Sequence, residues 1–119
     1  MGDPRLLARK KCLPCEGGVA SLTGTRAKKY LKSLSDWSLA KDAKSIWVEY
    51  QMKDFVSAVS LIQAIARVAE KEDHHPDLHL TDYRRLKIEL TTHAIEGLSE
   101  NDFILAAKID RLPKRFKEI

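Results

Sequence analysis

The sequence has few of the residues that build disulfide-rich, collagen-like or disordered chains. Its 119 residues include two cysteines, four prolines and five glycines, while 44% are hydrophobic and 32% are charged. This composition is typical of one globular domain, which at this length folds without metals or disulfides. The chain contains no run of roughly 18 apolar residues, and its first residues lack the apolar core of a signal peptide. We therefore expect a cytoplasmic protein with no membrane partner.

The sequence also lacks a basic surface of the kind that binds nucleic acid. Its net charge of +4 is concentrated at the ends, because residues 1–11 and residues 111–119 each carry +3. Residues 12–110 are left with −2. Since affinity for phosphate backbones depends on clustered Lys and Arg, we expect no nucleic-acid partner.

The two cysteines form a single Cys12-x-x-Cys15 pair followed by Glu-Gly-Gly. A four-thiolate zinc site needs a second pair, and a thioredoxin-type pair follows a strand, which is not predicted before Cys12. We interpret the pair as structural or incidental, with redox or metal chemistry as the alternatives.

Helical periodicity occurs in three parts of the chain. Apolar residues at helical spacing follow Thr23 or Thr25, either of which can cap a helix, and again follow Asp54. The second of these helices should stop at Pro76, because proline disfavours helical geometry in the preceding residue. The third helix begins after Ser99, whose Ser-x-x-Asp spacing resembles a capping box.

Period-two alternation occurs in two further segments, and predicts β-hairpins over residues 37–52 and residues 78–92. Residues 1–22 show no periodicity and are expected to be an irregular N-terminal arm, which leaves residues 23–119 as a single domain. The element order α-β-β-α-β-β-α indicates an α+β fold. We expect a four-stranded antiparallel sheet with three helices on one face.

The helix expected over residues 55–69 is apolar on more than one face. A helix that only covers a sheet needs a narrower apolar stripe, so we expect Leu61, Ile65 or Val68 to contact another subunit. The predicted assembly is a homo-oligomer, a dimer or a tetramer.

All four histidines fall within one short window, at His74, His75, His79 and His93. Imidazoles are suited to moving protons near pH 7, and three of the four lie at the ends of predicted elements, where side chains can converge. Zinc or iron binding is the alternative, but Pro76 prevents His75 and His79 from sharing a helix face as ligands. We therefore predict acid/base chemistry without a metal, and expect His79 to be a surface residue.

Three motifs together resemble the pterin-4a-carbinolamine dehydratase family. They are Glu-Lys-Glu-Asp-His-His-Pro at residues 70–76, Thr-Thr-His at residues 91–93, and Gly-Leu-Ser-Glu-Asn-Asp at residues 97–102. The resemblance covers roughly residues 25 to 112 and implies the element order given above. The segment from Cys12 onward looks like the start of bacterial and plant-type members, so the chain is identified with that branch.

The resemblance implies a cofactor-free dehydration of 4a-hydroxytetrahydrobiopterin to quinonoid dihydropterin and water, in tetrahydrobiopterin recycling. His74 and His93 would be the acid/base pair, in an order that the sequence leaves open, and His75 would chiefly clamp the substrate. The residues that would contact the pterin ring are Asp73, Thr91 and Thr92. The residues that would support the site are Glu70, Asp102 and Trp37.

Alternatives remain open for the supporting residues and for the activity. Asp102 would orient a histidine or cap the last helix. Glu70 would orient a histidine or be an ordinary solvated residue. Trp37 would line the pocket mouth or lie in the core. The alternative function is a noncatalytic module that binds a pterin or a protein, like a transcription cofactor, on the same fold.

Overall fold

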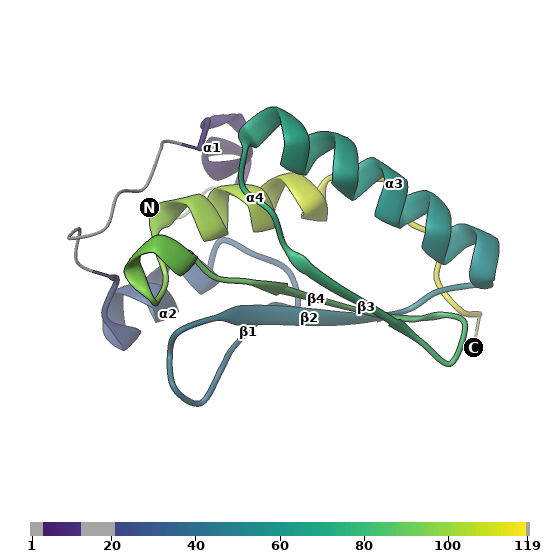
Figure 1. Cartoon of the computed structure of the whole chain (residues 1–119), viewed down its shortest axis with the longest axis horizontal. Coiled ribbons are helices and arrows are strands. Elements are labelled where there is room, and N and C mark those ends of the chain that lie inside the picture. The colour runs from purple at the N-terminus through teal and green to yellow at the C-terminus, as the bar shows by residue number, and fades with distance from the viewer. Residues whose placement is uncertain (1–3, 13–20, 119) are drawn as a thin grey trace.

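The computed structural model describes residues 4–12 and 21–118. Between these limits the chain forms four α-helices, four strands and one 3₁₀ helix, η1 (Figure 1). In chain order they are α1 (Pro4–Arg9), α2 (Gly24–Leu31), β1 (Ser38–Leu39), β2 (Ile46–Gln51), α3 (Phe55–Glu72), β3 (Asp77–Thr81), β4 (Arg85–Leu90), η1 (His93–Ile95) and α4 (Glu100–Asp110).

The four strands form one antiparallel sheet in the order β1-β2-β4-β3. Both predicted hairpins are present, and β2 and β4 join them in the centre, with Val48 opposite Ile88. The second hairpin ends earlier than predicted, because β4 stops at Leu90 and Thr92 instead forms an isolated bridge with Gly97. The predicted α+β class and four-stranded antiparallel sheet are confirmed.

One face of the sheet is buried and the other is polar. In β2 and β4 the alternate residues Ile46, Val48, Leu86, Ile88 and Leu90 are almost fully buried, whereas the residues between them are charged or partly exposed. Helices α3 and α4 lie over the buried face (Figure 1). This single apolar face explains the alternation in the sequence, since successive side chains of a strand point to opposite faces.

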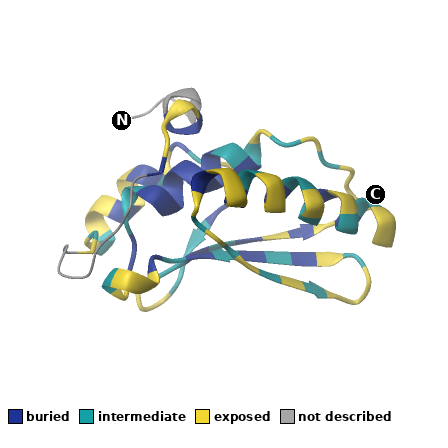
Figure 2. Ribbon diagram, turned by 45° about the horizontal axis from the view of Figure 1, so that its top comes forward, coloured by how far each residue is buried: buried dark blue, intermediate teal, exposed yellow. Residues whose placement is uncertain are grey.

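Helix α4 lies at the centre of the fold and is buried on nearly all sides (Figure 2). Residues 101–107 are all buried, and Phe103 stacks on Tyr30 of α2 with the ring centroids 4.9 Å apart. Through this aromatic contact α2 joins the helical layer. Burial, and a hydrogen bond to Glu100 at 2.8 Å, raise the pKa of Tyr30.

Helix α3 begins at the predicted cap and ends before the predicted proline. The Asp54 carboxylate accepts a hydrogen bond from the backbone N–H of Ser57 at 2.8 Å. Hydrogen bonding to the side chain and to the backbone of Ser57 lowers the pKa of Asp54. The helix stops at Glu72, because Asp73 adopts a left-handed conformation (φ 51°), three residues before Pro76. Left-handed backbone geometry ends the helix and turns the chain toward the site.

Two residues expected at a subunit contact lie instead in the core of the chain itself. Leu61 is 2% exposed and Ile65 is fully buried, while Val68 is partly buried against the same core. The expectation was wrong for Leu61 and Ile65, because they belong to the stripe of α3 that faces the sheet. The exposed apolar residues of α3 are others, Phe55 (53%) and Val56 (72%) among them.

The N-terminal arm is not irregular throughout, contrary to the expectation. Helix α1 packs against α4, and the Lys108 side chain of α4 donates a hydrogen bond to the backbone oxygen of Ala8 at 2.7 Å. Leu7 is 4% exposed and belongs to the core cluster. Cys15 and the glycines after it lie outside the described residues, so the interpretation of the cysteine pair stays a prediction.

Leu61 should therefore behave as a core residue of the single chain. We expect Leu61→Ala to lower the free energy of unfolding by about 2 to 5 kcal/mol, because it leaves a cavity under α3. Val56→Ala in the same helix should change it by about 0.5 kcal/mol or less, since the side chain is exposed. Urea denaturation followed by circular dichroism measures both values, and equal losses would place Leu61 outside the core.

Candidate active site

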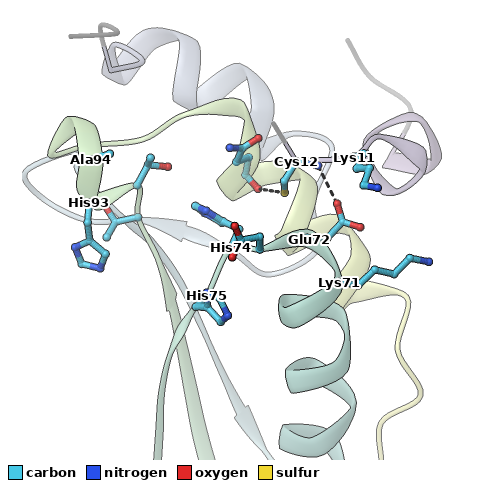
Figure 3. A pocket seen from close by; sticks show the side chains of 12 residues that line it. Lys11, Cys12, Lys71, Glu72, His74, His75, His93 and Ala94 are labelled. Atoms are coloured by element: carbon cyan, nitrogen blue, oxygen red, sulfur yellow. Dashed lines mark hydrogen bonds between the residues drawn. The ribbon is translucent and has the colours of Figure 1, made fainter. Parts of the chain in front are cut away.

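A pocket of about 480 Å³ opens where the end of α3, the segment after β4 and the start of α4 meet. This volume is within the range of small-molecule sites, about 300 to 1,000 Å³. The pocket brings together all six residues predicted to bind substrate, although they come from two distant parts of the chain (Figure 3). These are Asp73, His74, His75, Thr91, Thr92 and His93.

His74 is held by a buried carboxylate. Its Nε2 atom lies 2.6 Å from Oδ1 of Asp102, which is fully buried, and the His74 side chain itself is only 12% exposed. The second carboxylate oxygen, Oδ2, accepts hydrogen bonds from the Ser99 backbone N–H at 3.0 Å and the Thr92 hydroxyl at 2.9 Å. Asp102 therefore caps α4 and also contacts a histidine.

This contact determines how the neutral imidazole of His74 is protonated. A carboxylate accepts hydrogen bonds, so the ring places its proton on Nε2 and leaves the lone pair on Nδ1. Because Asp102 is anchored by two other donors, the ring is also fixed in orientation. His74 is thus prepared to accept a proton at Nδ1.

His75 is held more loosely by Glu70. Its Nε2 atom lies 2.5 Å from Oε2 of Glu70, one turn back on α3, but both side chains are more than half exposed. Solvent weakens the electrostatic attraction of such pairs. His75 can therefore exchange this contact for one with a ligand.

His93 is the third imidazole of the pocket, and it begins η1 directly after the two threonines. It is exposed and makes no side-chain hydrogen bond to any described residue. The ring is available to a molecule in the pocket.

The two threonine hydroxyls point into the protein rather than serving the pocket. Thr91 donates to the backbone oxygen of Lys44 at 2.5 Å, and Thr92 donates to Asp102. Ligand contacts from Thr91 and Thr92 are thus left mainly to their backbone groups. The turn that follows needs glycine at position 97, because a Cβ there would lie 2.7 Å from Cβ of Ser21.

The N-terminal arm forms one wall of the pocket, which sequence reasoning missed. The Cys12 backbone N–H donates to Oε1 of Glu72 at 2.8 Å, and the Cys12 thiol lies 3.6 Å from the backbone oxygen of Asn101. Glu72 carried a signal, since it continues the buried stripe of α3 but is charged. The Cys12-x-x-Cys15 spacing did not indicate that Cys12 would line the pocket. The lining residues not predicted are Lys11, Cys12, Lys71, Glu72, Ala94 and Asn101.

Two other expected residues lie away from the pocket. Trp37 is 7% exposed and belongs to the core, where its indole Nε1 donates to Oδ1 of Asp110 at 2.8 Å, so it does not line the pocket mouth in this chain. Burial raises the pKa of Asp110. His79 lies on the polar face of the sheet, 3.1 Å from Glu89, as expected of a surface residue.

In the part of the chain that the structure describes, no group of three or more His, Cys, Asp or Glu side chains is arranged to hold a metal ion. Nor does any helix among residues 4–12 and 21–118 have the length and apolarity to cross a membrane.

The Asp102 contact predicts a specific tautomer for His74. In long-range ¹H–¹⁵N spectra near pH 8, the neutral ring should carry its proton on Nε2, because Asp102 accepts it. Asp102→Asn should introduce the Nδ1-protonated form, since an amide can also donate. His79 provides the reference, as its ring contacts a partly exposed carboxylate. A wild-type His74 protonated mainly on Nδ1 would contradict the assignment.

Comparison with known proteins gives a consistent result. The sequence profile of the family described as "Pterin 4 alpha carbinolamine dehydratase" matches residues 20–112. A protein of Halorhodospira halophila that carries this family's name is 45% identical over 106 residues, which are 89% of this chain and 96% of that protein. "Pterin-4-alpha-carbinolamine dehydratase 2, mitochondrial" of Arabidopsis thaliana is 43% identical over 109 residues, which are 89% of this chain and 58% of that protein.

A solved structure agrees with these sequence matches. The "transcriptional coactivator/pterin dehydratase" from Brucella melitensis superimposes with a TM-score of 0.70 at 31% identity, covering 75% of this chain and 94% of that one. The family profile spans helices α2, α3 and α4, the four strands and the three pocket histidines. The chain belongs to the pterin-4a-carbinolamine dehydratase family.

Proposed function

We propose that this chain dehydrates 4a-hydroxytetrahydrobiopterin to quinonoid dihydropterin and water by histidine acid/base catalysis. The observation that carries the proposal is the convergence of His74, His75 and His93 on one pocket, with His74 held by the buried Asp102. The names of the relatives support the same reaction. The reaction would serve the recycling of tetrahydrobiopterin.

The proposed reaction is balanced by proton transfers alone. The C4a–O bond breaks and the hydroxyl leaves as water once it is protonated, while N5 loses its proton and forms a double bond to C4a. One general acid and one general base are therefore sufficient, and no redox or carrier group is needed. We assign the base to His74, whose Nδ1 lone pair is available, and the acid to His93.

The other pocket residues have binding roles in this proposal. His75 clamps the substrate after exchanging its contact with Glu70, and Asp73 accepts hydrogen bonds from the N–H groups of the pterin ring. Thr91 and Thr92 contribute backbone groups to the ring, while the Thr92 hydroxyl positions Asp102. The cytoplasmic location and the absence of a nucleic-acid partner stay predictions.

The alternative, a noncatalytic binding module, has one observation in its favour. The similar Brucella melitensis protein is named both a "transcriptional coactivator" and a "pterin dehydratase". A module that only binds protein has no need for three acid/base side chains that converge on one pocket. We therefore favour the enzyme.

A homo-oligomer that assembles through α3 is a second part of the proposal. Four apolar residues at spacings of three and four form a stripe beside the buried face of α3. They are Phe55, Val59, Ile62 and Ala66. Phe55 is 53% exposed, Ala66 is exposed, and Val59 and Ile62 are partly exposed. A second copy of the same helix would cover this stripe by an isologous contact, giving a dimer or, with another interface, a tetramer.

Catalysis is tested by the rate of quinonoid dihydropterin formation from freshly generated 4a-hydroxytetrahydrobiopterin, followed by ultraviolet absorbance against the spontaneous reaction. His74→Ala and His93→Ala should each lower kcat by about 100-fold or more, because each removes a proton-transfer group. His75→Ala should act mainly by raising KM.

The matched control is His79→Ala, which removes an exposed histidine outside the pocket and should leave the rate within about twofold of wild type. Folded wild-type protein that does not accelerate the reaction would remove the enzyme and favour the binding module.

The oligomer is tested by light scattering coupled to size-exclusion chromatography. Wild type should elute as a dimer or tetramer, and the double variant Val59→Glu/Ile62→Glu as a monomer, because buried unpaired charges oppose association. Ser60→Glu, on the exposed side of the same helix away from the stripe, should assemble like wild type. A wild-type monomer would contradict the proposal.

A further inference from the structure

Two lysines lie together at the end of the pocket formed by the N-terminal arm. Lys11 follows α1 and Lys71 belongs to the last turn of α3, and both side chains line the pocket. Figure 3 shows them on the same side of the pocket, beyond Cys12 and Glu72, whereas His75 and His93 occupy the opposite side. The pocket therefore has a histidine end and a lysine end.

The positive charge at the lysine end is not neutralised by the acidic residue beside it. The Glu72 carboxylate, which is buried, is used by the Cys12 N–H at 2.8 Å and lies 3.9 Å from the Lys108 ammonium of α4. Neither Lys11 nor Lys71 forms an ion pair or side-chain hydrogen bond with any described residue. Two lysines without an ion pair among the described residues thus line the same side of the cavity (Figure 3).

The remaining acidic residue of the lining, Asp73, has a different role in the proposed function. Its carboxylate accepts hydrogen bonds, which suits the N–H groups of the pterin ring rather than a lysine. The substituent at C6 leaves the ring next to N5, one of the two reacting atoms. In the ring, N5 lies between C4a and C6. With the C4a hydroxyl at His93 and N5 at His74, the C6 substituent therefore points away from His93, toward the side of the pocket on which Lys11 and Lys71 lie (Figure 3).

We propose that Lys11 and Lys71 form a subsite for an anionic group, a phosphate or a carboxylate, on the C6 side chain of the pterin. The inference rests on the proposed function, because it presumes a pterin at the histidine end. Ammonium groups bind phosphate and carboxylate through charge-assisted hydrogen bonds, which are stronger than those to a neutral hydroxyl. The subsite would make the protein selective for pterins with acidic side chains over biopterin.

A competing explanation uses no ligand. The C-terminal end of a helix attracts cations, so Lys71 is stabilised in the last turn of α3 by its position alone. Lys11 would then be an ordinary solvated residue. This explanation predicts no difference between a neutral and an anionic side chain, and binding measurements separate the two.

The test uses oxidised pterins, which do not react, so it does not depend on catalysis. Fluorescence quenching gives the Kd of 6-hydroxymethylpterin, its phosphate ester and 6-carboxypterin. We expect wild type to bind the phosphate ester at least about tenfold more tightly than the alcohol, which corresponds to about 1.4 kcal/mol. The preference should decrease as salt is raised, because the Debye length falls to about 3 Å at 1 M. Binding of the ester but not of 6-carboxypterin would identify phosphate as the anion.

The double variant Lys11→Gln/Lys71→Gln should lose this preference and bind the alcohol as wild type does. Lys28→Gln, an exposed lysine of α2 remote from the pocket, is the matched control and should keep it. Equal affinity of wild type for ester and alcohol, or a preference that survives the double substitution, would overturn the subsite. Wild-type protein that prefers the ester but does not accelerate the dehydration would contradict the proposed function and leave the subsite standing.

Discussion

The buried carboxylate of Asp102 is the constraint on which the site depends. A charge without solvent must be surrounded by donors, and this one receives them from three segments: the start of α4, the turn after β4 and the end of α3. Removing one member of such a cluster leaves a buried group unpaired, at a cost of about 3 to 5 kcal/mol. The same carboxylate thus caps α4 and positions His74.

The three histidines differ in how far this arrangement restrains them. His74 is nearly buried and held by an anchored partner, whereas His75 and His93 are exposed, the first with a solvated partner and the second with none among the described residues. A base that must present one lone pair benefits from a fixed ring. Groups that clamp a substrate or protonate a departing hydroxyl benefit from room to adjust to it.

The sequence predicted the fold well where periodicity was strong. The alternation of Ile46 to Tyr50 and of Leu86 to Leu90 identified the central strands, because only one face of the sheet is buried. It failed for helix α1, which is too short to show periodicity and owes its stability to packing on α4. It also mistook Leu61 and Ile65 for interface residues, since an apolar stripe does not say whether a sheet or a second helix will cover it.

The histidine cluster was predicted from residue types and the other site residues from the family resemblance, whereas the surroundings of the site were not predicted. The histidines and the His-His-Pro motif are local signals, and the pocket contains His74, His75 and His93, which they identified. The Ser-x-x-Asp spacing is also local, and it identified Asp102, which contacts His74. The arm wall depends on contacts between residues about 60 and 90 positions apart, Cys12 with Glu72 and with Asn101. No local pattern encodes such contacts. For Trp37 the same limit applies, because its partner is Asp110.

The distance along the chain between the walls of the pocket has a consequence for how the protein matures. Cys12 is synthesised 89 residues before Asn101, which belongs to the helix that holds the arm. Long-range contacts of this kind form late in folding, after the loop between them has closed. A nascent chain therefore has no complete pocket until α4 has been made, and competence to bind would appear only after that point.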